Sequence, residues 1–151
     1  FNNNMKVEEP PRVTIYTDGA CDPNPGHGGW AAILLQPDGK KEISGSENPS
    51  TNNRMELMAA IQALRELKNS SQVDLYTDSE YLRLGVERWM GEWVKRGWKR
   101  KQGKLANQEL WQELYQLNQK HWIRWHWVRG HSGDKYNERV NRLAQKAIRY
   151  R

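Results

Sequence analysis

The sequence predicts an α/β fold in which a mixed sheet of five strands is flanked by helices. Two features of the chain lead to this prediction. Segments that alternate apolar with polar residues, as half-buried strands do, form a group at the start and later alternate with segments of helical apolar spacing. In addition, the strand-like segment at residues 13–19 returns almost unchanged at residues 73–79.

Three strand-like segments open the chain, and the sequence Pro-Asp-Gly at residues 37–39 supplies a tight turn between the second and the third. This turn predicts an antiparallel hairpin. The first helix is expected where Met55, Met58, Ile61 and Leu64 recur at helical spacing. The predicted strands cover residues 12–17, 29–35, 41–46, 73–78 and 122–128. The predicted helices cover residues 51–68, 79–94, 107–119 and 134–148.

The chain is expected to form a single domain over residues 12–151 that follows a tail at residues 1–11. A length of 151 residues is enough to bury one core, and no linker or low-complexity stretch divides it. Residues 1–4, which precede Met5, are left out of the fold prediction. No membrane-spanning stretch or signal peptide is recognised, and the single cysteine excludes an internal disulfide. We therefore expect a cytoplasmic monomer with no membrane partner.

The net charge of +6 is concentrated in one short segment. Residues 95–104 contain six lysines and arginines and no acidic residue, which equals the whole excess of positive charge. Such a run is often only a solvated surface. Here it lies beside Trp89, Trp93 and Trp98, and cations close to aromatic rings favour a surface that binds nucleic acid.

Both copies of the repeated segment end in an aspartate followed by a small residue, as Asp18-Gly19 and Asp78-Ser79. If the two strands are adjacent and parallel, both aspartates lie at the same edge of the sheet. Neighbouring carboxylates repel each other unless a cation lies between them, so the repeat predicts a divalent metal site. Taken singly, the first pair could instead form a turn and the second could cap a helix. The two copies taken together favour the metal site.

Glu56 is the third candidate ligand. Asparagines precede it and alanines follow it on the same side of the predicted helix, which leaves a face on which another element can pack closely. The spacing from Asn53 to Glu56 fits a capping box equally well, with Asn53 as the cap of the helix. Spacing alone leaves both interpretations open.

Four motifs, by their order and spacing, resemble ribonuclease H of type 1 in its stand-alone bacterial form. They are Tyr-Thr-Asp-Gly at 16–19, Thr-Asn-Asn-Arg-Met-Glu-Leu at 51–57, Tyr-Thr-Asp-Ser at 76–79 and Gly-His-Ser-Gly at 130–133. The resemblance covers residues 12–150 and implies the ribonuclease H-like fold, with the basic segment at about 89–104 as a substrate-binding protrusion. It implies an endonuclease that cuts the RNA strand of an RNA–DNA hybrid and leaves a 5′-phosphate and a 3′-hydroxyl.

The resemblance also implies a site of four acidic residues that holds two Mg²⁺ or Mn²⁺ ions. Asp18 matches the acid that bridges the ions, while Glu56 and Asp78 match acids that each complete one coordination sphere. Oxygen ligands and two hard cations suit phosphodiester cleavage, because a water must be activated and a leaving oxygen stabilised. Glu56 is also expected to meet a ribose hydroxyl. His131 matches a loop histidine that assists proton movement or product release, although a loop histidine is often an ordinary surface residue.

The chain departs from the family at the fourth acidic position, where it has Asn141 in place of aspartate, one helical turn after Glu138. An amide oxygen can still touch a metal, but the site loses one negative charge. We therefore expect metal to bind and cleavage to be severely weakened. The alternative is that Asn141 is only a hydrogen-bonded polar residue beside the apolar stripe of the last helix.

The resemblance further assigns residues that hold the hybrid. Asn24 lies in a loop, residues 21–29, that is rich in glycine and proline and could also be a plain turn; it matches a contact to ribose hydroxyls. Asn52 and Asn53 match contacts to base edges or sugars in the minor groove. Trp89 and Trp93 match aromatic residues that pack on deoxyribose, although their spacing of four also fits a helix core.

The remaining assignments concern one phosphate and the basic segment. Thr51 and Asn107 match a pocket for a phosphate of the DNA strand, but Pro49 stands where relatives often have an arginine, so a weaker pocket is expected. The other substrate-binding candidates are Cys21, Lys95, Arg96, Trp98 and Lys99. The cations among them supply affinity that depends on salt and not on sequence.

Two other functions stay open on the sequence alone. Asn141 favours a non-catalytic module that binds RNA–DNA hybrids. A related nuclease, such as an integrase core or the nuclease domain of a reverse transcriptase, is the other alternative. The stand-alone length and the basic segment argue against the second of these.

Overall fold

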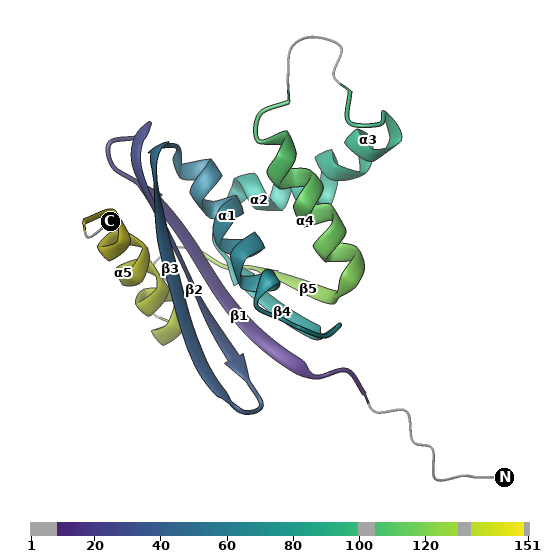
Figure 1. The fold of residues 1–151 in the computed structure, drawn as a ribbon, viewed down its shortest axis with the longest axis horizontal. Helices are drawn as coiled ribbons and strands as arrows, with labels where there is room; N and C mark the ends of the chain where they lie inside the picture. The colour runs from purple at the N-terminus through teal and green to yellow at the C-terminus, as the bar shows by residue number, and fades with distance from the viewer. Residues whose placement is uncertain (1–8, 100–104, 130–133, 150–151) are drawn as a thin grey trace, which may run out of the picture.

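The computed structural model describes residues 9–99, 105–129 and 134–149, which form one five-stranded sheet with helices on both faces (Figure 1). The strands are β1 (Arg12–Cys21), β2 (Gly26–Gln36), β3 (Gly39–Ser50), β4 (Gln72–Thr77) and β5 (Trp122–Trp127). Their order in the sheet is β3-β2-β1-β4-β5. The β1–β2 and β2–β3 pairs are antiparallel, and the β1–β4 and β4–β5 pairs are parallel. The mixed sheet predicted from the sequence is thus confirmed.

The helical elements are α1 (Asn52–Arg65), α2 (Glu80–Leu84), one π-helical turn η1 (Gly85–Trp89), α3 (Met90–Lys95), α4 (Gln108–Lys120) and α5 (Lys135–Arg149). Figure 1 shows α5 on one side of the sheet and α1 and α4 on the other. No helix in the described ranges is both long enough and apolar enough to cross a membrane.

Each face of the sheet carries its own apolar core. On the α1 and α4 side, Ile15, Leu34, Leu75 and Trp111 are fully buried among the helical leucines. On the α5 side, the core is smaller and is built from Tyr16, Ala20, Ala31, Ile33, Val140 and Ala144. Complete burial of one such large side chain stabilises the fold by about 1.5–3 kcal/mol. The two cores therefore hold α1 and α5 against opposite faces of β1.

The predicted hairpin is present, but the strands run further than predicted. Gln36 pairs with Gly39 across the two turn residues, and Gly39 has a φ of 145°, which glycine adopts without strain. At the other end of the hairpin, Cys21 pairs with Gly28, so only residues 22–25 of the expected loop lie outside strands. Alternation of polar and apolar residues cannot reveal the start of β2, where three of the first four residues are glycine, because glycine has no side chain to alternate.

Residues 80–94 are helical, as predicted, but they do not form one regular α-helix. They belong to α2, η1 and α3, and the Ser79 hydroxyl caps α2 by accepting the N–H of Leu82 at 3.1 Å. A Cβ atom at Gly85 would lie only 2.0 Å from the ring of Trp111. The buried tryptophan therefore occupies the space of a side chain at 85, at the residue where the widened π-helical turn begins.

Helix α1 begins earlier than a capping box at Asn53 requires. Its cap is Thr51, whose hydroxyl accepts the N–H of Arg54 at 3.1 Å. The interpretation of Asn53 and Glu56 as a capping box is therefore wrong. Glu56 lies inside the helix on its buried side.

Candidate functional site

The two copies of the repeated segment are neighbouring parallel strands in matching register. β1 and β4 pair Val13 with Val73, and the pairing continues to Tyr16 and Tyr76, so each residue lies opposite its equivalent. Asp18 is still in β1, and Asp78 follows the last residue of β4. The prediction that both aspartates lie at one edge of the sheet is confirmed, and the alternative of a turn at Asp18 is wrong.

Glu56 reaches the same point from α1. A Cβ atom at Gly19 would lie 2.3 Å from the Glu56 nitrogen, so the missing side chain at Gly19 is what lets α1 lie directly on β1. Carboxylate oxygens of Asp18, Glu56 and Asp78 all lie within 4.8 Å of one another. Asp18 and Glu56 are only 7% and 6% exposed, whereas Asp78 is exposed.

The surroundings of Glu56 oppose its ionised form. Burial, followed by the neighbouring carboxylates of Asp18 and Asp78, raises the pKa of Glu56 well above its ordinary value, and the Gly19 N–H offsets this only in part. Within the described ranges, no donor reaches the buried Oε1 of Glu56. A buried, unpaired carboxylate oxygen is costly unless a cation binds it. Oxygen donors are what Mg²⁺ and Mn²⁺ prefer, so these residues fit a divalent metal centre.

Asn141 approaches the cluster from α5. Its Nδ2 donates a hydrogen bond to Oδ2 of Asp18 at 2.8 Å, so the side chain is hydrogen-bonded, as the plainer interpretation required, and its partner is a site aspartate. A hollow beside these residues is lined by Thr17, Asp18, Asp78, Val128, Arg129, Asn137, Glu138, Val140 and Asn141. Sequence reasoning gave Arg129 and Glu138 no role in the site; their only signal was closeness to the last motif and to Asn141.

Five of the predicted substrate-binding residues line a second hollow at the start of α1. Its lining consists of Asn24, Pro25, Thr51, Asn52, Asn53, Tyr81, Ala106 and Asn107. Oδ1 of Asn24 accepts the N–H of Asn52 at 3.1 Å, which ties the loop after β1 to the helix. A third hollow is lined by Tyr81, Trp89, Trp93, Leu105 and Ala106. Because Tyr81 and Ala106 line both, the two hollows adjoin, and together they are called the polar–aromatic groove below.

Two aromatic residues of this groove, Tyr81 and Trp93, also pack against the larger core, whereas contact of Trp89 and Trp93 with deoxyribose stays a prediction. Trp93 packs against the larger core, and its ring lies 5.4 Å from that of Trp111 and 6.0 Å from that of Trp98. Trp89 lies edge-on to Tyr81 at 5.9 Å. Sequence reasoning missed Tyr81, because a single tyrosine on a helix gives no signal of a groove.

Four of the other predicted substrate-binding residues, Cys21, Lys95, Arg96 and Lys99, are not in the lining of these three hollows. Lys95, Arg96 and Lys99 are exposed, and Lys95 lies 3.6 Å from Glu92. The Cys21 thiol contacts the backbone carbonyls of Pro23 at 3.2 Å and Ser50 at 3.5 Å. His131, predicted as a catalytic residue, and the cations Arg100, Lys101 and Lys104 lie outside the described residues.

Known proteins resemble this chain in sequence and in fold. The family model for RNase H matches residues 10–149. A ribonuclease H from Chromohalobacter salexigens is 56% identical over 138 residues, which are 91% of this chain and 84% of that protein. A ribonuclease H from Bradyrhizobium diazoefficiens is 52% identical over 143 residues, which are 94% of this chain and 93% of that protein.

Two solved structures share the fold. LC9-RNase H1, described as a type 1 RNase H with the type 2 active-site motif, has a TM-score of 0.84 and 36% identity, over 95% of this chain and 74% of that chain. LC11-RNase H1 in complex with an RNA/DNA hybrid has a TM-score of 0.65 and 21% identity, over 90% of this chain and 99% of that chain.

Proposed function

Because the chain belongs to the ribonuclease H family, we propose that it hydrolyses the RNA strand of RNA–DNA hybrids at the cluster of Asp18, Glu56 and Asp78. The observation that carries this proposal is the convergence of three carboxylates from β1, α1 and the end of β4 within 4.8 Å. A hybrid is the substrate in this proposal because a structural relative, LC11-RNase H1, is described in complex with one.

In this proposal Asp18, Glu56 and Asp78 would hold two Mg²⁺ or Mn²⁺ ions, with Asp18 as a ligand common to both. Bound there, the ions would activate a water and neutralise charge on the leaving oxygen, as cleavage to a 5′-phosphate and a 3′-hydroxyl requires. Glu56 is held by α1 in a buried position where Oε1 has no other donor in the described ranges, so it is oriented toward the cluster before any ligand binds. We assign to His131 the movement of a proton or the release of the product.

The polar–aromatic groove holds the hybrid in this proposal. Asn24, Asn52 and Asn53 contact riboses and base edges in the shallow minor groove of the A-like duplex. Thr51 and Asn107 bind a phosphate of the DNA strand. The lining of the third hollow, Trp89 and Trp93 included, packs on deoxyribose and disfavours a strand with 2′-hydroxyls. The exposed cations Lys95, Arg96 and Lys99 add affinity that depends on salt. Trp98, in the same segment, also contacts the hybrid in this proposal.

Asn141 supports a second candidate function, a module that binds hybrids and cleaves them poorly. Its amide donates to Asp18, so the fourth position supplies a neutral donor where a metal site needs an acceptor. The amide must turn to offer its oxygen to an ion. Even then, two divalent ions face three carboxylate charges in place of four, which weakens the neutralisation that catalysis needs.

Cleavage of an RNA–DNA hybrid labelled on each strand in turn tests the proposal, with Mg²⁺ and with Mn²⁺. We expect slow cleavage of the RNA strand only, with 5′-phosphate ends, and no cleavage of duplex DNA, duplex RNA or single-stranded RNA. Tight hybrid binding without cleavage in either ion would favour the binding module. Equal cleavage of duplex DNA would contradict the proposal and favour a related nuclease.

A further inference from the structure

One arginine that sequence reasoning passed over connects the walls of the polar–aromatic groove. Arg54, near the start of α1, donates from Nε to Oε1 of Glu47 on β3 at 2.7 Å. Its Nη1 donates to Oδ1 of Asn107 at 3.1 Å and to Oε1 of Glu109 on α4 at 2.9 Å. A single side chain therefore joins α1, β3 and the beginning of α4.

Asn107 is the groove residue that this arginine touches. It precedes α4 in the left-handed conformation, with φ 59° and ψ 29°, which asparagine tolerates better than most residues. Its Nδ2 donates to the hydroxyl of Tyr81 at 3.1 Å, and the same hydroxyl accepts Nε1 of Trp111 at 3.0 Å. Both ends of the amide thus have partners from other elements.

The chemistry of arginine decides which way this amide faces. A guanidinium has only donors, so Asn107 must turn its oxygen toward Arg54 and its nitrogen away from it. The nitrogen then lies on the side of Tyr81, which lines the groove, and one of its two hydrogens is left for a ligand. An uncharged partner that could also accept a hydrogen bond would permit either orientation.

Arg54 itself is poorly placed to attract a phosphate. Two carboxylates, Glu47 and Glu109, contact its guanidinium, and its side chain is only 27% exposed. Their negative charge offsets its positive charge. Its effect on a ligand therefore has to pass through Asn107.

We propose that Arg54 is a positioning residue for substrate binding, which holds the Asn107 amide so that Nδ2 donates to a phosphate oxygen of the bound nucleic acid. This inference rests on the proposed function, because the phosphate belongs to the hybrid. The role is larger in this chain because Pro49 offers neither a donor nor a charge beside Thr51. The Thr51 hydroxyl already accepts the Arg54 N–H as the helix cap.

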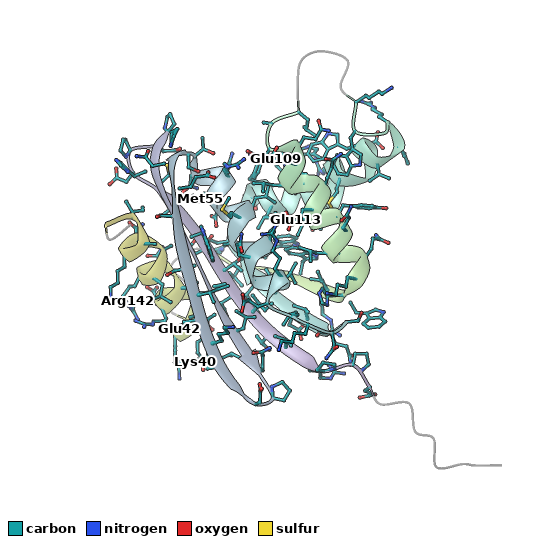
Figure 2. All side chains as sticks on the ribbon, viewed as in Figure 1. Lys40, Glu42, Met55, Glu109, Glu113 and Arg142 are labelled. Atoms are coloured by element: carbon teal, nitrogen blue, oxygen red, sulfur yellow. The ribbon has the colours of Figure 1, made fainter. Side chains whose placement is uncertain are left out.

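The chain contains a matched control for this proposal. Arg65 lies on the same helix and forms an ion pair with Glu113, also on α4. Glu109 and Glu113 follow each other along α4 in Figure 2. Arg65→Gln therefore removes a bridge between the same two helices without removing any contact to Asn107.

The test measures the dissociation constant of a fluorescently labelled RNA–DNA hybrid by anisotropy, without divalent ions, over a range of salt concentrations. We expect Arg54→Gln to raise the dissociation constant about five- to tenfold, the effect of losing roughly one ordinary hydrogen bond. Arg54→Lys, which keeps a donor, should recover part of the loss. Arg65→Gln should leave the constant unchanged.

Two further readouts separate positioning from simpler roles. In an Asn107→Ala background, Arg54→Gln should add no further loss, because the two residues act as one unit. The slope of log affinity against log salt should stay the same, whereas loss of a direct phosphate contact would reduce it by about 0.9.

Equal losses in Arg54→Gln and Arg65→Gln, additive losses with Asn107→Ala, or a reduced salt slope would each overturn the inference. If Arg54→Gln does not fold, Arg54→Lys carries the test: we expect it to bind more tightly than Asn107→Ala with the salt slope of the parent, and a loss as large as that of Asn107→Ala would overturn the inference. If the parent binds the hybrid no better than duplex DNA, the proposed function fails, and the inference fails with it.

Discussion

Glu56 is a residue whose ionised form is opposed by its surroundings, since burial and two nearby carboxylates raise its pKa. Without metal, both the folded and the unfolded chain are protonated at this position below pH 4.5, the ordinary value. As the pH rises, the unfolded chain ionises first, so the folded state loses stability relative to it. Metal binding reverses this loss because it requires the ionised form.

Glu56→Gln should therefore stabilise the metal-free chain at pH 7, on the order of 1 kcal/mol or about 2–4 °C in melting temperature. The difference should vanish below about pH 4, where both forms are neutral. Thermal unfolding of both chains across this pH range, with and without Mg²⁺, checks this prediction. Mg²⁺ should raise the melting temperature of the parent and not of the variant. A variant less stable than the parent at pH 7 would show that the carboxylate has an uncounted partner.

Single residues differ in how far the sequence predicted them. The positions of Asp18 and Asp78 could be predicted because the repeat itself states the strand register. Glu56 could be named as a candidate but not separated from a capping box, because spacing along a helix does not show which element covers it. The contact of Arg54 with Asn107 could not be predicted, because the two residues are 53 positions apart in the sequence. The contact with Glu47, seven positions away, joins a helix to a strand, and no local pattern shows how these two pack.

Among the elements, α1 and β1 form the contact on which the site depends. Gly19 permits it, since a Cβ atom there would lie 2.3 Å and 2.4 Å from backbone atoms of Glu56 and Met55. Backbone atoms cannot rotate aside as a flexible side chain can. Any side chain at 19 must therefore push α1, and Glu56 with it, away from β1.

Gly19→Ala should destabilise the fold by about 1–3 kcal/mol and weaken Mg²⁺ binding. The matched control is Gly91→Ala in α3, where a Cβ atom meets nothing within 4 Å and should stabilise the helix by about 0.5–1 kcal/mol. Urea unfolding measures the stability of both variants, and titration calorimetry measures the affinity of Gly19→Ala for Mg²⁺. Equal stability of the parent and Gly19→Ala would mean that α1 can move away at no cost.

His121 joins the end of α4 to the turn before β4. Its Nδ1 accepts the N–H of Ser71 at 3.1 Å, and burial, with the nearby Lys120, lowers the pKa of the ring below its ordinary value of 6.5. As the pH falls below about 6.5, the unfolded chain takes up a proton first, and the folded state loses stability.

The free energy of unfolding of the parent should therefore fall between pH 7.5 and pH 5 by more than that of His121→Asn, which has no ring to protonate. Urea unfolding at several pH values provides the comparison. Identical pH dependence in the two chains would contradict the assigned role of the ring. The other histidines are present in both chains and cancel in the difference.

The elements also differ in whether a local sequence pattern can predict them. The hairpin was predictable from Pro37, Asp38 and Gly39, because a turn has local chemistry. The start of β2 was not, since its glycines give no alternation. The π-helical turn at Gly85 follows from a ring on another helix, which a local pattern cannot contain.

At the scale of the whole molecule, the sheet and α1 position both the carboxylate cluster and part of the polar–aromatic groove. The parallel half of the sheet places the repeated aspartates side by side, and α1 contributes both Glu56 and the asparagines of the polar–aromatic groove. The fold class was predictable because strands and helices alternate with different periods. The groove was only predictable residue by residue through the family resemblance, because its lining comes from four separate segments.

The central claim is that this fold holds a two-metal nuclease site whose fourth position is neutral. Asn141→Asp restores the missing charge at the atom that contacts Asp18. A matched control is Asn137→Asp, which adds a carboxylate to the same hollow one helical turn earlier and should give a much smaller effect.

The deciding measurement is the rate at which each chain cleaves the RNA strand of a hybrid in Mg²⁺. We predict that Asn141→Asp raises this rate by about 100-fold or more, because a direct ligand should matter at least as much as the residues that orient metal ligands, whose loss costs about 10- to 100-fold, and that it leaves duplex DNA uncut. A rate equal to that of the parent in both Mg²⁺ and Mn²⁺ would contradict the account.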